Sequence, residues 1–144
     1  MSAVKLPYSS FNNANFNSCK LIGINWAQVK WPYIALVAPI AFNDCDISLS
    51  SFFELKLSEL ILTNSKAHDV DFRGCELIGA DFSGTDFEKS QFMKTTLKNA
   101  DFANASNYNI NPTENNISKA RFSFPDVCNL LQTFDIKIEG VYED

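Results

Sequence analysis

The sequence lacks the features that mark several common functional classes. It contains only five glycines, and no glycine-rich loop is followed by Lys-Ser or Lys-Thr, so we expect no phosphate-binding loop. Its longest apolar stretch, from Tyr33 to Phe42, is broken by Pro39 and is too short to span a bilayer. Met1 is followed by no basic, apolar and cleavage-site series. We therefore expect a cytoplasmic protein with no membrane-spanning segment.

Catalytic and metal-binding residues are equally scarce. The single histidine, His68, leaves the many serines and threonines without a general base in any repeated arrangement. The cysteines at positions 19, 45, 75 and 128 match no zinc-binding spacing. We therefore expect no catalytic site, no metal site and no cofactor.

What the chain has instead is a period of five. From Phe42 to Phe102 a large apolar residue stands at every fifth position, and only Ala67 is undersized. A period of five fits neither a helix nor a strand, so each unit must turn a corner and let its successors stack. The central residues are Phe42, Ile47, Phe52, Leu57, Leu62, Ala67, Phe72, Leu77, Phe82, Phe87, Phe92, Leu97 and Phe102.

A second inward position lies two residues before each central residue and is mostly small. Cys45 and Cys75 occupy it in this run, and Cys19 does so nearer the N-terminus. Because these positions point inward, we expect buried free thiols rather than disulfides. Gly74, Gly79 and Gly84 are five apart, and we expect each to mark a turn of the repeat.

The run resembles the pentapeptide repeat family, whose motif is A(D/N)Lxx with Leu or Phe at the centre. The resemblance covers most of residues 9–122. It implies an all-β fold, a right-handed quadrilateral parallel β-helix in which four pentapeptides form one square coil. The clearest matches are Ala14-Asn15-Phe16-Asn17-Ser18, Val70-Asp71-Phe72-Arg73-Gly74, Ala80-Asp81-Phe82-Ser83-Gly84, Thr85-Asp86-Phe87-Glu88-Lys89 and Ala100-Asp101-Phe102-Ala103-Asn104.

Four repeats per coil place residues twenty apart above one another, and like then stacks on like. Phe72 is expected between Phe52 and Phe92, which is the geometric test of this interpretation. Ala67 should leave a gap that Phe87 or His68 fills. The remaining columns are Leu57, Leu77 and Leu97; Phe42, Leu62, Phe82 and Phe102; and Ile47, Ala67 and Phe87.

The rod is predicted to span residues 1–122, with a one-residue phase shift between residues 31 and 42. The earlier phase comprises Phe11, Phe16, Leu21, Trp26 and Trp31. We favour an unbroken rod with one bulge near Pro39, because the intervening residues are too apolar for a solvated loop. The alternative is a loop excursion from Pro32 to Ala41, since prolines remove backbone donors.

Residues 123–144 are predicted to form a C-terminal element of another kind. Ser123 is expected to cap a short helix starting near Pro125 or Asp126, and a short strand is expected at residues 136–138. This element either covers the open end of the rod or joins two rods into a homodimer. Its apolar face comprises Val127, Leu130, Leu131 and Phe134.

Function is expected on the outward side chains. Residues 42–102 carry eleven acidic and six basic side chains, and the register gathers Asp44, Asp81 and Asp101 on a side without lysine or arginine. We therefore predict a non-catalytic scaffold that binds a protein partner through this acidic side. Aspartate before the central residue also belongs to the repeat motif, where it can bond the backbone at a corner, so its role can be structural alone.

The resemblance implies a more specific alternative. Some family members imitate duplex DNA, bind type II topoisomerases and protect them from quinolones, which makes DNA gyrase or topoisomerase IV a candidate partner. Regularly spaced carboxylates would then occupy a basic groove that normally binds phosphates, without direct contact between this chain and nucleic acid. A third possibility is a rod that assembles with itself through the C-terminal element.

Overall fold

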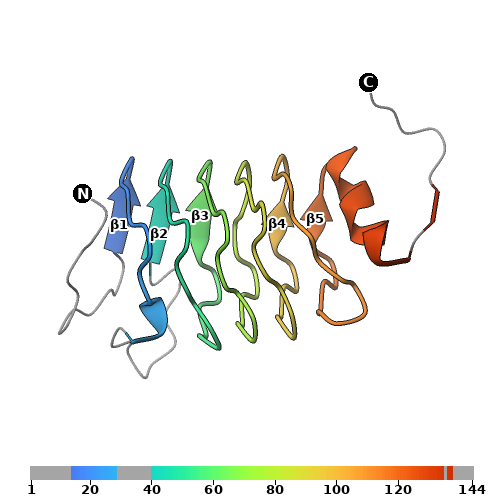
Figure 1. The fold of residues 1–144 in the computed structure, drawn as a ribbon, viewed down its shortest axis with the longest axis horizontal. Helices are drawn as coiled ribbons and strands as arrows, with labels where there is room; N and C mark the ends of the chain where they lie inside the picture. Colours follow the sequence, from blue (N-terminus) through green and yellow to red (C-terminus); the bar gives the residue numbers. More distant parts are fainter. Residues whose placement is uncertain (1–13, 29–39, 135, 138–144) are drawn as a thin grey trace.

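The computed structural model describes residues 14–28, 40–134 and 136–137, and these form a rod of stacked coils with a short helix at its C-terminal end (Figure 1). Adjacent coils pair in parallel through residues twenty apart, at four positions five residues apart. The pairs of one coil with the next are Asp46 with Lys66, Ser51 with Asp71, Lys56 with Glu76, and Ile61 with Asp81. The twenty-residue register is therefore confirmed, and the fold is a parallel β-solenoid.

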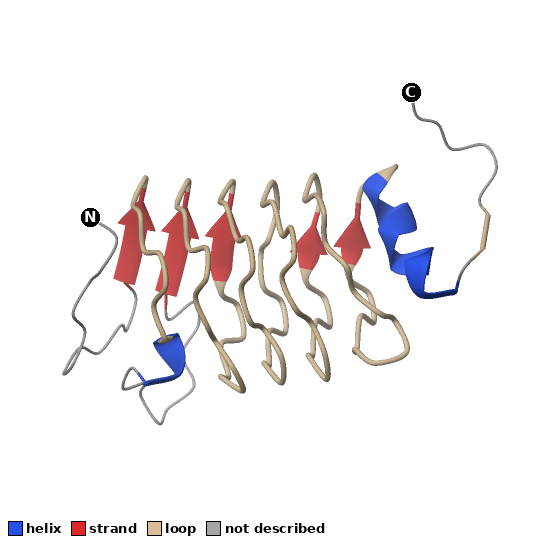
Figure 2. Cartoon of the chain, viewed as in Figure 1, coloured by secondary structure: helices blue, strands red, loops and turns tan. Residues whose placement is uncertain are grey.

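The named strands follow one another along the same side of the rod, and the C-terminal helix lies beyond the last strand (Figure 2). Three strands form one parallel sheet in the order β1-β2-β3, and β4 pairs in parallel with β5. No helix among the described residues has the length and apolarity needed to cross a membrane. The elements are β1 (Ala14–Asn17), η1 (Trp26–Gln28), β2 (Ile40–Asn43), β3 (Ile61–Thr63), β4 (Asp101–Phe102), β5 (Arg121–Phe122) and η2 (Asp126–Phe134).

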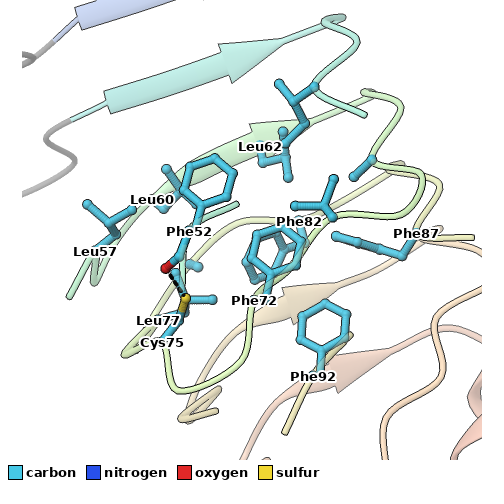
Figure 3. Packing of buried hydrophobic residues seen from close by; sticks show 14 of the residues in the cluster. Phe52, Leu57, Leu60, Leu62, Phe72, Cys75, Leu77, Phe82, Phe87 and Phe92 are labelled. Atoms are coloured by element: carbon cyan, nitrogen blue, oxygen red, sulfur yellow. Dashed lines mark hydrogen bonds between the residues drawn. The ribbon is translucent and has the colours of Figure 1, made fainter. Parts of the chain in front are cut away.

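Stacked aromatic rings form the centre of the rod. The Phe72 ring lies between those of Phe52 and Phe92, with centroid distances of 5.4 and 5.0 Å and interplanar angles of 6° and 9° (Figure 3). The predicted sandwich is thereby confirmed. Neighbouring columns meet edge to face, as where Phe87 contacts Phe82 at 5.4 Å. Each ring therefore buries its faces against its own column and its edge against the next.

The small inward residues have a second role besides fitting the space. The Thr85 hydroxyl donates to the Leu62 carbonyl at 2.7 Å. The Cys75 thiol donates to the Phe52 carbonyl at 2.9 Å (Figure 3). Burial raises the pKa of the Cys75 thiol to about 12, which makes it a structural thiol. All four cysteines are free; Cys45 is buried as predicted, whereas Cys19 is only partly buried.

The corners require a left-handed backbone. From Phe42 to Phe102, the residue two positions after each central residue has a positive φ, for example +72° at Gly84 and +61° at Asn104. Glycine, asparagine and aspartate adopt this region at little cost, which explains why the repeat places them there. The predicted role of Gly74, Gly79 and Gly84 as turn residues is confirmed.

The first described coil corrects one prediction. Phe16 pairs with Phe42, which is 26 residues further on, and Asn25 likewise pairs with Ser51. An offset of 26 is six residues more than in later coils, so it produces the expected phase shift of one. A bulge of one residue would instead have placed Leu21 beside Phe42, and that prediction is wrong.

Aromatic packing supplies the physical reason. Phe16 stacks on Phe42 at 5.5 Å, and Trp26 stacks on Phe52 at 5.8 Å. This register pairs ring with ring, whereas the bulge would have placed Leu21 on Phe42. The six extra residues fall between Asn25, which pairs with Ser51, and Ile40, which pairs with Ala14. The loop alternative from Pro32 to Ala41 falls mostly on residues 29–39, and these residues and the predicted centres Phe11 and Trp31 lie outside the described residues.

The last coil departs from the repeat and then returns to it. Tyr108, not Asn107, is the buried residue next to the core, and Ile110 is buried where it pairs with Phe92. Thr96 pairs with Asn116, so the twenty-residue register is restored there. The segment from Asn109 to Asn116 therefore contacts the core through Ile110.

The C-terminal helix η2 lies against the last coil, in agreement with the predicted start near Asp126. The expected cap is wrong: the Ser123 hydroxyl accepts from the Asn104 N–H at 2.9 Å, and the Ser123 carbonyl accepts from the Val127 N–H at 2.9 Å. The side chain is thus engaged by the preceding coil. Residues 136 and 137 form no strand, and residue 138 lies outside the described residues.

Candidate partner-binding face

The side of the rod that carries β1 to β5 is the candidate binding face, and we call it the strand face. Its outward side chains are mostly short, so few long and flexible side chains cover the backbone on this side. Short side chains leave a flat surface that loses little side-chain entropy when it is covered. The outward residues flanking its central positions are Asn15, Asn17, Ala41, Asn43, Ile61, Thr63, Asp81, Ser83, Asp101, Ala103, Arg121 and Ser123.

Two of the predicted site residues are neighbours on this face. Asp81 pairs with Asp101 on the next coil. The Asp81 carboxylate accepts from the Ser83 N–H at 3.0 Å and from the Ser83 hydroxyl at 2.7 Å, and the Asp101 carboxylate accepts from the Ala103 N–H at 2.9 Å. Both aspartates therefore hold the corners of the repeat, while they also bring two negative charges one coil apart.

Asp44, the third predicted residue, lies apart from this pair. It occupies a corner, with a φ of +59°, and its carboxylate accepts from the Ser18 hydroxyl at 3.0 Å. Along the row that contains Asp81, the residues of the two preceding coils are the apolar Ile61 and Ala41. The structure thus brings Asp81 and Asp101 together and leaves Asp44 two coils away.

The prediction of an unrelieved negative field needs correction at the C-terminal end. Arg121 follows Asp101 in the same row, and its guanidinium Nη1 lies 3.2 Å from Asp101 Oδ2. The earlier count stopped at Phe102, so the next coil was left out, although Arg121 stands twenty residues after Asp101. An exposed ion pair of this kind contributes at most about 1 kcal/mol, but it halves the local negative charge.

The C-terminal residues that we predicted for capping or dimerisation divide into two groups. Leu130 is only 8% exposed, and together with the partly buried Val127 it packs against the core of the rod. Leu131 is half-buried, whereas Phe134 is 45% exposed. Phe124 and Ile136 are also exposed, so the C-terminal element combines side chains packed on the core with exposed apolar side chains.

The side that carries Phe52, Phe72 and Phe92 displays a feature that sequence reasoning missed. The Arg73 guanidinium lies 5.2 Å from the centre of the exposed Phe53 ring and donates twice to the Asp71 carboxylate at 2.9 Å. Burial raises the pKa of Asp71, but the hydrogen bonds and charge of Arg73 outweigh it and hold the pKa below its ordinary value. The charge of the Arg73 guanidinium is therefore already paired within the molecule.

The comparisons with known proteins concern the repeat. A family model described as "Pentapeptide repeat region" matches residues 24–102. Comparison with curated protein sequences found no match.

The solved structures that this chain resembles share little sequence with it. Full-length QnrB1, described as a plasmid-mediated fluoroquinolone resistance protein, aligns over 89% of this chain and 84% of its own, with 13% identity and a TM-score of 0.46. Rfr23, a pentapeptide repeat protein from the cyanobacterium Cyanothece 51142, aligns over 80% and 84%, with 14% identity and a TM-score of 0.29. Identities this low do not indicate a shared function.

Proposed function

Because the chain belongs to the pentapeptide repeat family, we propose that it is a non-catalytic scaffold in the cytoplasm that binds a protein partner along its strand face. The observation that carries this proposal is the pair Asp81 and Asp101, which stand one coil apart on a side of mostly short outward residues. Carboxylates fixed at a rigid corner need little reordering when a cationic partner docks. We further propose that the coils wind right-handedly and are four-sided, as the resemblance implies.

Affinity capture with charge-matched variants tests this proposal. The face variant carries Asp44→Asn, Asp81→Asn and Asp101→Asn. Asparagine keeps an oxygen that can accept from the backbone N–H at positions 81 and 101 and from the Ser18 hydroxyl at position 44, so the corners remain intact. The control variant carries Glu54→Gln, Glu59→Gln and Glu76→Gln, which removes the same charge from other sides of the rod. Each is immobilised and exposed to extract of the source cells at low and high salt.

We expect the intact chain and the control to retain the same partner, with retention falling as salt rises, and the face variant to lose it. Equal retention by both variants would reject the strand face. If the intact chain retains nothing, the scaffold proposal itself fails.

A more specific form of the proposal takes type II topoisomerase, DNA gyrase or topoisomerase IV, as the partner. It is supported by the regular spacing of Asp81 and Asp101 along a narrow rod, because carboxylates so placed can occupy a groove lined for phosphates. The ion pair between Arg121 and Asp101 weakens this mimicry at one end.

A gyrase supercoiling assay, with and without a quinolone, decides between the two forms. We expect the intact chain to change supercoiling or the response to quinolone, and the face variant to do so much less. No effect at any protein concentration would exclude gyrase, and an equal effect of the face variant would show that other residues mediate it.

Self-association is a separate candidate, and the exposed side chains of Phe124, Phe134 and Ile136 favour it. Sedimentation velocity of the intact chain and of a Phe124→Ser/Phe134→Ser variant tests it while Leu130 stays in place. We expect the intact chain to form dimers and the variant to be monomeric. A monomeric intact chain would exclude a dimer through this element.

A further inference from the structure

Three groups that can ligate a metal converge on the side of the rod next to the strand face. His68 belongs to one coil, and Asp86 and Glu88 belong to the next. His68 Nε2 lies 2.7 Å from Asp86 Oδ2 and 3.9 Å from Glu88 Oε1, and the three ligand atoms lie within 4.8 Å of one another. Within the described ranges this is the one group of three such side chains.

The distances between these atoms are close to those that one ion would impose. A zinc ion at about 2.0–2.1 Å from each ligand in tetrahedral geometry sets its ligand atoms about 3.3 Å apart. The separation from His68 to Asp86 is shorter than this value and that from His68 to Glu88 is longer. Glu88 is 53% exposed, so rotation of its side chain can shorten the longer separation, whereas an ion bound between His68 and Asp86 replaces their hydrogen bond.

A fourth residue fixes the orientation of the Asp86 carboxylate. Asp86 Oδ1 accepts from the Asn107 amide at 2.9 Å and from the Glu88 N–H at 3.1 Å. These bonds occupy Oδ1 and leave Oδ2 facing His68. They are hydrogen bonds of the kind that hold a metal ligand in place from outside the coordination sphere.

The repeat departs from its own rule at two places beside this cluster. Ala67, the undersized central residue, immediately precedes His68, and at Asn107 a polar residue stands where a central apolar residue is expected. Tyr108 enters the core in its place, and the Asn107 side chain turns outward to Asp86. Asn107, which departs from the apolar pattern of the repeat, therefore supplies the amide that positions the Asp86 carboxylate.

We propose that His68, Asp86 and Glu88 form a binding site for a divalent transition-metal ion, with Zn²⁺ as the ion that these ligands suit. One imidazole and two carboxylates match the nitrogen and oxygen preference of zinc and leave a position for water. The neighbouring cations Lys66 and Lys89 make the site weaker than its ligand set alone suggests. Because the ligands come from two coils, the bound ion ties those coils together and stabilises the rod.

Isothermal titration of the full chain with zinc chloride in a chelator-free buffer tests the proposal, and thermal unfolding with and without zinc gives a second readout. The variants are His68→Gln, Asp86→Asn and Glu88→Gln, with Glu76→Gln as the matched control, because Glu76 precedes Leu77 as Asp86 precedes Phe87. Asn107→Gly removes the amide while tolerating the positive φ of +57°.

We expect one zinc ion per chain and a zinc-dependent rise in melting temperature. Affinity should fall at least tenfold in His68→Gln and Asp86→Asn, by about tenfold in Asn107→Gly, and not at all in Glu76→Gln. Absence of stoichiometric binding to the intact chain overturns the proposal. Unchanged binding in His68→Gln also overturns it, because zinc then occupies other ligands such as the partly exposed thiols. Glu88→Gln, which changes the most exposed ligand, keeps the test valid if another variant fails to fold.

Discussion

At the scale of single residues, the corners show whether side-chain packing offsets the steric cost of a left-handed backbone. Asn64, Asn99 and Asn104 occupy the left-handed corner position, and they adopt it with little strain. Leu49 occupies the same position with a φ of +62° while its side chain is 62% exposed. A branched apolar residue there gains little from packing and bears the steric cost of the left-handed region.

We therefore expect Leu49→Asn to raise the free energy of unfolding by about 1 kcal/mol, measured by urea denaturation. The reverse change at an equivalent corner, Asn99→Leu, serves as the control and should lower it by a similar amount. A loss of stability in Leu49→Asn would mean that the leucine side chain makes a contact worth more than the strain.

The ion pair between Asp71 and Arg73 predicts a dependence on pH. The pKa of Asp71 is lower in the folded chain than in the unfolded chain, so the ionised carboxylate favours the folded state. This contribution is complete above about pH 4 and disappears as the pH falls through the lower folded-state pKa. Asp71→Asn should therefore reduce the free energy of unfolding by up to about 1 kcal/mol at pH 7, and not at pH 2.

Denaturation of both proteins across this pH range, at low and high salt, measures the difference. Asparagine still accepts from the Arg73 N–H, so the corner itself is preserved. High salt should shrink the difference at pH 7. A loss of the same size at both pH values would show that geometry, not charge, is responsible.

At the scale of elements, the C-terminal helix is the part of the chain where pattern and structure agree only partly. The helical spacing predicted an apolar face from Val127 to Phe134, and the structure packs Val127 and Leu130 on the core but leaves Phe134 exposed. The 3₁₀ form of η2 explains the division, because three residues per turn rotate successive side chains differently from an α-helix.

This division predicts unequal effects of two substitutions. Leu130→Ala should lower the free energy of unfolding by about 2 kcal/mol, because it opens a cavity where the helix covers the last coil. Phe134→Ala should change it by less than about 0.5 kcal/mol in the monomer. Equal losses, measured by thermal or urea unfolding at low protein concentration, would contradict this view of the helix as a cover.

At the scale of the whole molecule, stability is distributed along a column of stacked rings, and each coil contacts only its neighbours. Phe72 lies at the middle of one column, so a cavity there weakens the contact between the two halves of the rod. The neighbouring column already holds a leucine, Leu62, next to Phe42. A leucine is therefore compatible with this spacing.

Phe72→Ala should lower the free energy of unfolding by about 3–4 kcal/mol, and Phe72→Leu by about 1 kcal/mol. The alanine variant should also unfold with a smaller urea dependence, because the two halves can then unfold separately. Phe53→Ala, on the exposed surface of the same coil as Phe52, is the control and should have little effect. A loss of less than about 1 kcal/mol in the free energy of unfolding of Phe72→Ala would mean that this column of rings is not the main source of the stability of the rod.

Much of the fold was predictable because the repeat is local and regular. The period of five, the twenty-residue register and the Phe52–Phe72–Phe92 stack all follow from the order of residues, since each coil repeats the environment of the last. The first coil was not predictable in the same way. Both a bulge and a loop produce a phase shift of one, and only the packing of Phe16 on Phe42 distinguishes an offset of 26 from one of 21.

The candidate site shows the same limit more clearly. The order of residues alone identified Asp81 and Asp101 as neighbours on one side, because a fixed register assigns every residue to a row. The register also places Arg121 in the row of Asp101. Whether two charges form an ion pair depends on side-chain rotation, so the contacts of Arg121 with Asp101 and of Arg73 with Asp71 are known only from the folded chain. The meeting of His68 with Asp86 and Glu88 is likewise decided in three dimensions, because torsions of long side chains, unlike the backbone period, are set by contacts between coils.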